Sequence, residues 1–156
     1  MSNYCNFMKD FPQRTIYNLK FIEKEQSKGN TVYEVTQLIN SLLGLIVFTR
    51  EMKIDISNGN PVYTDIKEGI KLNSANKEIL SKIRNGISHR RIWTYGNPIS
   101  KIIIQDVDLG DTFNQSKEEP LDILIWKDKG LNFHLESSLE DFRKFVNELA
   151  IYLENL

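Results

Sequence analysis

An arginine, an asparagine and a histidine lie close together in the string Leu80-Ser-Lys-Ile-Arg84-Asn85-Gly86-Ile-Ser-His89. Apolar residues recur at helical spacing in the same string, so we expect it to form a helix. At 100° per residue, Ser88, Asn85 and His89 then lie about 40°, 100° and 140° from Arg84. The apolar side chains lie on the other side of Arg84, at about −40° to −100°; they are Leu80, Ile83 and Ile87. Arg84, Asn85, Ser88 and His89 would therefore share one face.

These side chains could act together on a phosphate group. An imidazole can move a proton near neutral pH. A guanidinium can bind a phosphate through two hydrogen bonds and offset the charge that develops on it, and an amide can orient the scissile group or the histidine. The same spacing also fits a solvated helix end, and Gly86 fits either a close backbone approach or a frayed helix.

The formal net charge is −1, so a generally basic surface for nucleic acid is not expected. Lys82, Arg84, Arg90 and Arg91 nevertheless lie within ten residues with no acid among them. This run is either a local RNA-binding patch or a solvated helix end, where cations favour the negative pole of the helix dipole.

An earlier, strongly apolar segment predicts a central, buried helix that starts at a Thr31–Glu34 capping box. One narrow arc of this helix is polar or small, and it comprises Tyr33, Thr36, Gln37, Asn40 and Gly44. A polar stripe on a buried helix needs partners. It could form a structural hydrogen-bond network, or it could face a subunit or a ligand.

The remaining elements follow from caps, periodicity and turn signals. We expect a first helix from Asp10 to Gly29-Asn30, a third from Asn73 or Ser74 to about His89, and a last helix from a Ser137 capping box. Asn58-Gly59-Asn60-Pro61 predicts a turn, with a short helix near Asp65 to Ile70. The expected strands are Lys101 to Val107, Leu121 to Trp126 and Leu131 to Leu135, with a hairpin at Asp128-Lys129-Gly130.

The totals indicate one cytoplasmic domain over residues 1–156. The single cysteine allows no internal disulfide and no zinc cluster, so we expect neither a metal nor a cofactor. The N-terminus lacks the basic and apolar regions of a signal peptide. The longest apolar stretch, Leu42 to Phe48, is too short for a membrane span.

Two strings resemble the HEPN superfamily (higher eukaryotes and prokaryotes nucleotide-binding). The first, Leu80 to His89, is similar to its arginine-x4-6-histidine signature, often with asparagine after the arginine. The second, Tyr33 to Val47, resembles the long second helix of a bacterial and plasmid-borne member family. The resemblance implies a mainly α fold: a four-helix up-and-down bundle with a small antiparallel β-sheet before the C-terminal helix. It also implies a homodimer in which the two motifs meet.

The resemblance further implies a metal-independent endoribonuclease, a toxin or anti-phage effector, in which Arg84 and His89 carry catalysis and Asn85 supports them. An antitoxin or regulatory protein would be a further partner. Relatives paired with such an antitoxin often have tyrosine two residues after the histidine, where this chain has Arg91. The alternative is a noncatalytic module that binds RNA, a nucleotide or a partner protein. The expected supporting or RNA-binding residues are Tyr33, Thr36, Asn40, Ser88, Arg90 and Arg91.

Three other groups of residues favour structural roles. His134 is expected to be a surface or paired strand residue, and Trp93 and Tyr95 to pack after the third helix rather than stack on bases. Asp106, Asp108 and Asp111 lack the glycine and glutamate of a calcium loop, so we expect them to form a solvated strand end.

Overall fold

A computed structural model describes residues 6–54, 56, 63–108 and 118–156 of the chain. The turn expected at Asn58 to Pro61 and the carboxylate of Asp111 lie outside these residues. The chain divides into two compact units. The helical unit comprises Met1–Ile54 and Arg143–Leu156, and the sheet unit comprises Asp55–Phe142. Each is described by itself.

Helix α1 spans Phe7–Ser27 and begins three residues before the predicted start at Asp10. Asn6 caps it, because its side-chain oxygen accepts a hydrogen bond from the Met8 N–H at 3.1 Å. The Asp10 carboxylate accepts the Asn6 N–H at 3.0 Å, so Asp10 supports the cap from inside the helix. The predicted end is confirmed, since Gly29 follows the C-cap in a left-handed conformation.

Helix α2 spans Glu34–Glu51, but the capping box predicted at Thr31 is wrong. Glu34 is buried and accepts a hydrogen bond from Arg143 of α5, so its carboxylate is not available to cap the helix. The polar stripe is also not buried as expected. Tyr33 is 77% exposed, and Thr36 and Asn40 are exposed as well.

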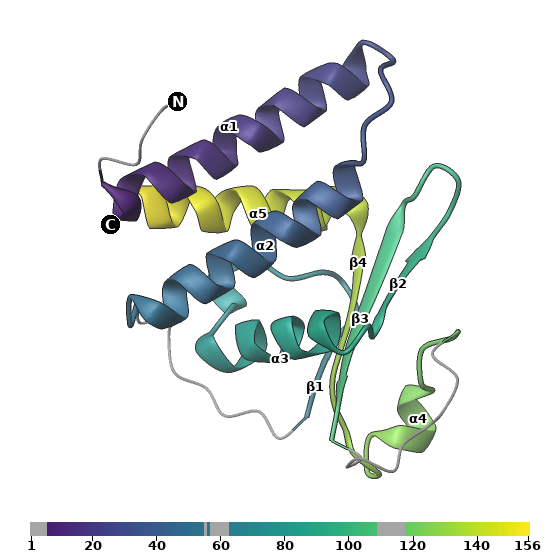
Figure 1. Ribbon diagram of the computed structural model, residues 1–156. Coiled ribbons are helices and arrows are strands. Elements are labelled where there is room, and N and C mark those ends of the chain that lie inside the picture. Colours follow the sequence, from purple (N-terminus) through teal and green to yellow (C-terminus); the bar gives the residue numbers. More distant parts are fainter. Residues whose placement is uncertain (1–5, 55, 57–62, 109–117) are drawn as a thin grey trace. The chain divides into compact units, whose positions relative to one another are not determined.

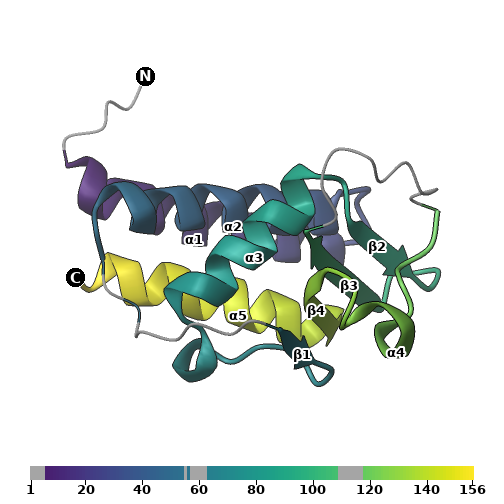
Figure 2. The same cartoon turned by 90° about the horizontal axis from the view of Figure 1, so that it is seen from below.

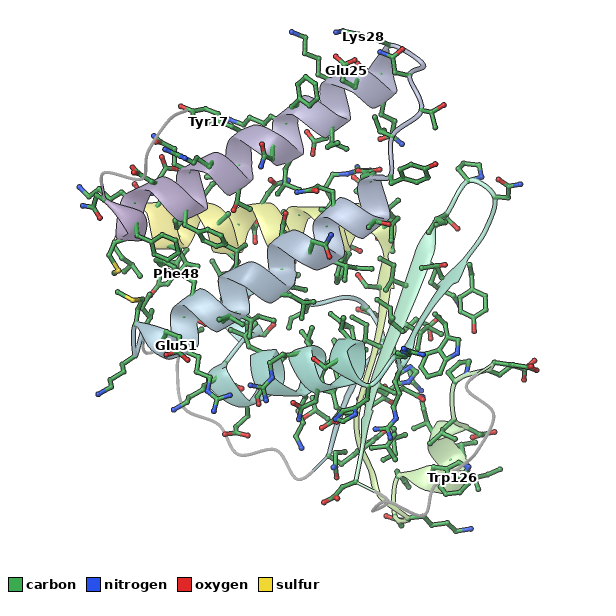
Figure 3. All side chains as sticks on the ribbon, viewed as in Figure 1. Tyr17, Glu25, Lys28, Phe48, Glu51 and Trp126 are labelled. Carbon is green, nitrogen blue, oxygen red and sulfur yellow. The ribbon has the colours of Figure 1, made fainter. Side chains whose placement is uncertain are left out.

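Within the helical unit, α1 and α2 form an antiparallel hairpin (Figure 1). The Phe48 side chain of α2 is labelled in Figure 3. Its ring centroid lies 5.9 Å from that of Phe7 and 5.7 Å from that of Phe11, both on α1. Gly44 makes this approach possible, because a Cβ there would lie 2.8 Å from the Phe11 ring. Arg143 of α5 pairs with both Glu23 of α1 and Glu34 of α2.

The sheet unit contains a four-stranded sheet in the order β1-β4-β3-β2. Its strands are β1 Thr64–Ile66, β2 Ile92–Tyr95, β3 Lys101–Val107 and β4 Leu131–Ser138. Two predicted strands are thus confirmed, as β3 and β4. The sheet is not purely antiparallel, however, because β1 pairs with β4 in parallel. It also does not come only from the segment before the last helix, because β1 precedes the third helix.

The strand predicted at Leu121 to Trp126 is wrong, and the hairpin that it required is wrong with it. Ile123–Trp126 forms the short helix α4, capped by Asp122, and β4 pairs with β1 and β3 instead. A short apolar run has no period that separates a strand from a helical turn. The short helix expected near Asp65 to Ile70 is replaced by β1.

Helix α3 spans Lys77–Ser88 and is capped by Asn76, three residues beyond the earliest predicted cap. The predicted caps Asn73 and Ser74 belong to a 3-10 turn, Leu72–Ser74. Figures 1 and 2 show α3 running across one face of the sheet. Helix α5 spans Leu139–Glu154, and its cap is Ser138 rather than Ser137.

The described chain is therefore mainly helical, with a small mixed sheet. The arrangement of the helices as a four-helix up-and-down bundle remains a prediction. Within the described ranges, no helix combines the length and the apolar character needed to cross a bilayer.

Gly86 fixes the approach of α3 to the sheet. A Cβ at this position would lie 2.6 Å from both the Gln105 carbonyl oxygen and Ile104 Cγ2 of β3. On an exposed helix, Gly86→Ala would stabilise by about 1 kcal/mol. Here the overpacking dominates, and we expect a loss of about 1 to 3 kcal/mol. Urea unfolding should give a lower midpoint, and a midpoint above wild type would contradict the contact.

Candidate functional site

Arg84 and Asn85 form a bonded pair on α3. Nε and Nη2 of Arg84 donate to the Asn85 side-chain oxygen at 3.3 and 2.7 Å, and Nη2 also reaches Ser81 Oγ at 3.5 Å. Both residues are half-buried. Asn85 therefore holds the guanidinium in one orientation, whereas the sequence indicated that the amide would orient the scissile group or the histidine. Ser81 was not foreseen, although it lies one helical turn before Arg84.

The charge of Arg84 has no carboxylate partner among the described residues. Neighbouring Lys82 differs, because its ammonium lies 3.3 Å from the Asp106 carboxylate of β3. Asp106 is buried in this contact, so the solvated strand end predicted there is wrong for this residue. Arg84 thus combines a fixed orientation with a charge that no described carboxylate pairs with, an arrangement that suits contact with an anionic group.

His89 is the C-cap of α3, and its side chain is exposed. The backbone N–H of His89 donates to the backbone carbonyl of Asn85 at 2.9 Å, so the helix places the histidine one turn after the Arg84–Asn85 pair. Ser88, the last residue of the helix, is exposed beside it. The structure thus brings together Arg84, Asn85, Ser88 and His89 at the end of one helix.

The turn after His89 has the hydrogen bonds of a Schellman motif. The Arg90 N–H donates to Ile87 O at 3.0 Å, and the Arg91 N–H donates to Gly86 O at 2.7 Å. Arg90 occupies the left-handed position, with φ of 59°, where glycine is usual. Its side chain is exposed.

Arg91 points back toward the sheet. Its Nη1 donates to the Val107 carbonyl of β3 at 2.9 Å. Its own carbonyl accepts the Gln105 N–H at 3.0 Å. These contacts anchor the turn between α3 and β2, so Arg91 has a structural task beside any contact with RNA.

Thr36 and Asn40 lie on α2 and Tyr33 is its N-cap residue; all three belong to the helical unit and are exposed. Gln37 of the same stripe donates to Ser41 Oγ at 3.3 Å, a bond within the helix. The role of this set at the site stays a prediction.

Sequence reasoning missed a buried polar cluster around Gln105 of β3. The Gln105 side chain donates to the Leu121 carbonyl and accepts the Leu121 N–H, each at 2.8 Å. Its Nε2 also lies 3.0 Å from Nδ1 of His134, and the carboxylate of Glu136 is 3.8 Å from the other ring nitrogen. A glutamine after three isoleucines was the available signal. His134 is confirmed as a paired strand residue, and it is buried.

The contacts of Gln105 determine the tautomer of His134. The two bonds with Leu121 orient the amide, so Nε2 of Gln105 donates to Nδ1 and the ring proton lies on the histidine Nε2. Burial lowers the pKa of His134, although the nearby Asp65 and Glu136 carboxylates oppose the shift. The protonated form of His134 is thus disfavoured, and Nδ1 acts as an acceptor.

No group of three histidine, cysteine or acidic side chains in the described parts of the chain could hold a metal ion.

The arginine–asparagine pair with a histidine one turn later fits the arginine-x4-6-histidine signature that the sequence resembles. The chain matches the family model described as HEPN pEK499 p136 over residues 1–156, and it belongs to that family. Neither a search of curated proteins nor a search of solved structures finds a match.

The lowered pKa of His134 predicts that acid will destabilise the fold. As the pH falls below about 6.5, the unfolded chain takes up the proton first. The contribution of His134 to the free energy of unfolding is therefore fully present above this pH. It is lost as the pH falls from this value toward the lower pKa of His134 in the folded protein. The free energy of unfolding should fall from pH 7 to 5.5 more steeply in wild type than in His134→Gln. Equal slopes in the two proteins would contradict the assignment.

Proposed function

We propose that the protein is a metal-independent endoribonuclease whose site comprises Arg84, Asn85 and His89. The observation that carries the proposal is the Arg84 guanidinium, which Asn85 orients and which lacks a carboxylate partner among the described residues. Membership of a HEPN family supports the same reading, because many members are ribonucleases.

The reaction is an internal transfer at phosphorus. The 2′-hydroxyl oxygen of one ribose attacks the adjacent phosphorus, and the bond from phosphorus to the 5′-oxygen of the next nucleotide breaks. A base takes the 2′-hydroxyl proton and an acid supplies a proton to the departing 5′-oxygen, which leaves a 2′,3′-cyclic phosphate and a 5′-hydroxyl. His89 serves as one of these groups. Arg84 stabilises the extra negative charge of the pentacoordinate state.

One histidine cannot be both the base and the acid in a single step. We therefore propose that two copies of the chain form a homodimer and that the second His89 completes the site. Ser88 and Arg90 would contact the RNA beside His89, with Arg91 at the base of the turn. Tyr33, Thr36 and Asn40 are proposed as supporting residues on α2.

In the cell, this activity fits a cytoplasmic toxin or an anti-phage effector, restrained by an antitoxin or regulatory protein. The second candidate is a noncatalytic module that binds RNA, a nucleotide or a partner protein through the same residues. The exposure of His89 and Ser88 fits both candidates, and RNA cleavage separates them.

His89→Ala should lower RNA cleavage by about a hundredfold to ten-thousandfold, the usual effect of losing a general acid–base group. Arg84→Ala should also lose activity, and Asn85→Ala should lose less because Asn85 only orients the arginine. Lys77→Ala, which removes an exposed cation at the opposite end of α3, should cleave like wild type. The assay follows a labelled mixed RNA with and without chelator, and circular dichroism checks folding. Cleavage by His89→Ala at the wild-type rate would refute the catalytic role.

The homodimer should have a mass near twice 18.2 kDa by light scattering at micromolar concentration. The proposed site needs two histidines, so activity per chain should fall on dilution as the dimer dissociates. A monomer with undiminished cleavage would contradict the shared site.

A further inference from the structure

Strand β2 begins three residues after His89 and forms one edge of the sheet. In its register with β3, Trp93 lies opposite Ile103 and Tyr95 lies opposite Lys101. Side chains alternate between the two faces of a strand. Since Ile104 faces Gly86 of α3, its neighbour Ile103 points to the other face, and Trp93 and Tyr95 point there too. The two aromatic rings thus share the sheet face opposite α3.

Tyr95 is accessible on this face. It is 39% exposed, and the Lys101 ammonium lies 5.1 Å from its ring centroid. Trp93 is half-buried and stands two residues earlier on the same strand, about 7 Å away. Tyr95 is thus an exposed aromatic ring with a cation beside it, although the sequence favoured packing there, whereas half-buried Trp93 is consistent with partial packing.

The surrounding segment carries positive charge in an otherwise slightly acidic chain. From Ile79 to Gln105 the sequence contains no aspartate or glutamate. Two cations of this segment form ion pairs with carboxylates outside it: Lys82 pairs with Asp106, and Lys101 pairs with Glu136. The other three have no carboxylate partner among the residues that the structure describes; they are Arg84, Arg90 and Arg91.

Arg90 adds a second observation, because its backbone is strained. A left-handed conformation costs a non-glycine residue about 1 to 2 kcal/mol. Glycine would form the same Schellman turn without that cost. Strained residues gather at functional sites, and an exposed guanidinium directly after His89 is one reason to retain arginine here.

We propose that β2 is a subsite for single-stranded RNA, in which Tyr95 and Trp93 stack on bases and Arg90 contacts the backbone phosphate between them and His89. The proposal rests on the proposed ribonuclease function and specifies the form of its substrate. Six extended residues span at most about 20 Å, so a few nucleotides connect His89 to Tyr95. Bases inside a duplex are unavailable for such stacking, and the subsite therefore selects unpaired RNA.

The test measures binding by fluorescence anisotropy, with a labelled single-stranded oligonucleotide whose 2′-O-methyl groups prevent cleavage. Tyr95→Leu should weaken binding by about fivefold to a hundredfold, the usual effect of losing one stacked base. Tyr95→Phe keeps the ring and should bind within about twofold of wild type. Thr94→Ala is the matched control, since Thr94 is exposed on the opposite face of the same strand, and it should bind like wild type.

Arg90→Gly separates binding from folding. It should raise the melting temperature, because glycine relieves the left-handed strain. It should also weaken RNA binding and lower the slope of log K against log salt by about 0.7, as expected for one lost contact with a single strand. A destabilised Arg90→Gly protein, or an unchanged salt slope, would contradict the assignment of Arg90.

The outcomes distinguish this subsite from the proposed catalysis. If wild type binds the oligonucleotide but cuts no RNA, and Tyr95→Leu weakens binding, the subsite stands and the ribonuclease proposal fails. If wild type cuts RNA, and Tyr95→Leu binds RNA with the affinity and KM of wild type, the subsite is wrong and the ribonuclease proposal stands. If Tyr95→Leu instead lowers the mass in light scattering without changing affinity per chain, β2 is a contact between copies and the RNA subsite is wrong. Absence of binding by wild type also overturns it.

Discussion

The close approach of Gly86 to the backbone of β3 is the contact on which the geometry of the sheet unit depends. A helix can approach a strand this closely only where it lacks a side chain. From this contact a series of hydrogen bonds extends through the unit. The Gly86 carbonyl accepts from Arg91, the Arg91 carbonyl accepts from Gln105, and the Gln105 side chain binds Leu121 and His134. The end of α3, the turn after it and the segment before α4 are therefore fixed by one connected network.

This network explains why the candidate site lies at the end of α3. The helix cannot continue past Ser88, because the Schellman bonds at Ile87 and Gly86 reverse the chain toward β2. His89 and Arg90 thus occupy the turn, where their side chains are exposed, while Arg84 and Asn85 remain half-buried one turn earlier. An oriented guanidinium beside an accessible imidazole is a consequence of where the helix must stop.

The sequence predicted the structure correctly where the spacing of apolar residues and the chemical types of the polar residues indicated the same element. The angular placement of Arg84, Asn85, Ser88 and His89 needed only the helical repeat, and β3 and β4 needed only their apolar and alternating runs. It was misleading where a side chain has a partner far away in the sequence. Glu34 has the position of a capping residue, but its carboxylate accepts a hydrogen bond from Arg143 instead. Likewise, β1 and β2 are three and four residues long, too short to show a period, and they form only because β4 and β3 offer open edges.

Arg90 shows how stability and recognition can oppose each other at one residue. The Schellman turn by itself favours glycine, and the sheet unit gains no hydrogen bond among its described residues from the arginine side chain. The Gly86 contact and the Gln105 hydrogen bonds stabilise this part of the fold, and they offset the strain in the left-handed backbone of Arg90. Because those contacts lie on the sheet side of the turn, the solvent side is left for charged and aromatic side chains. The same constraint that ends α3 therefore leaves His89, Arg90 and Tyr95 exposed, as the proposed RNA subsite requires.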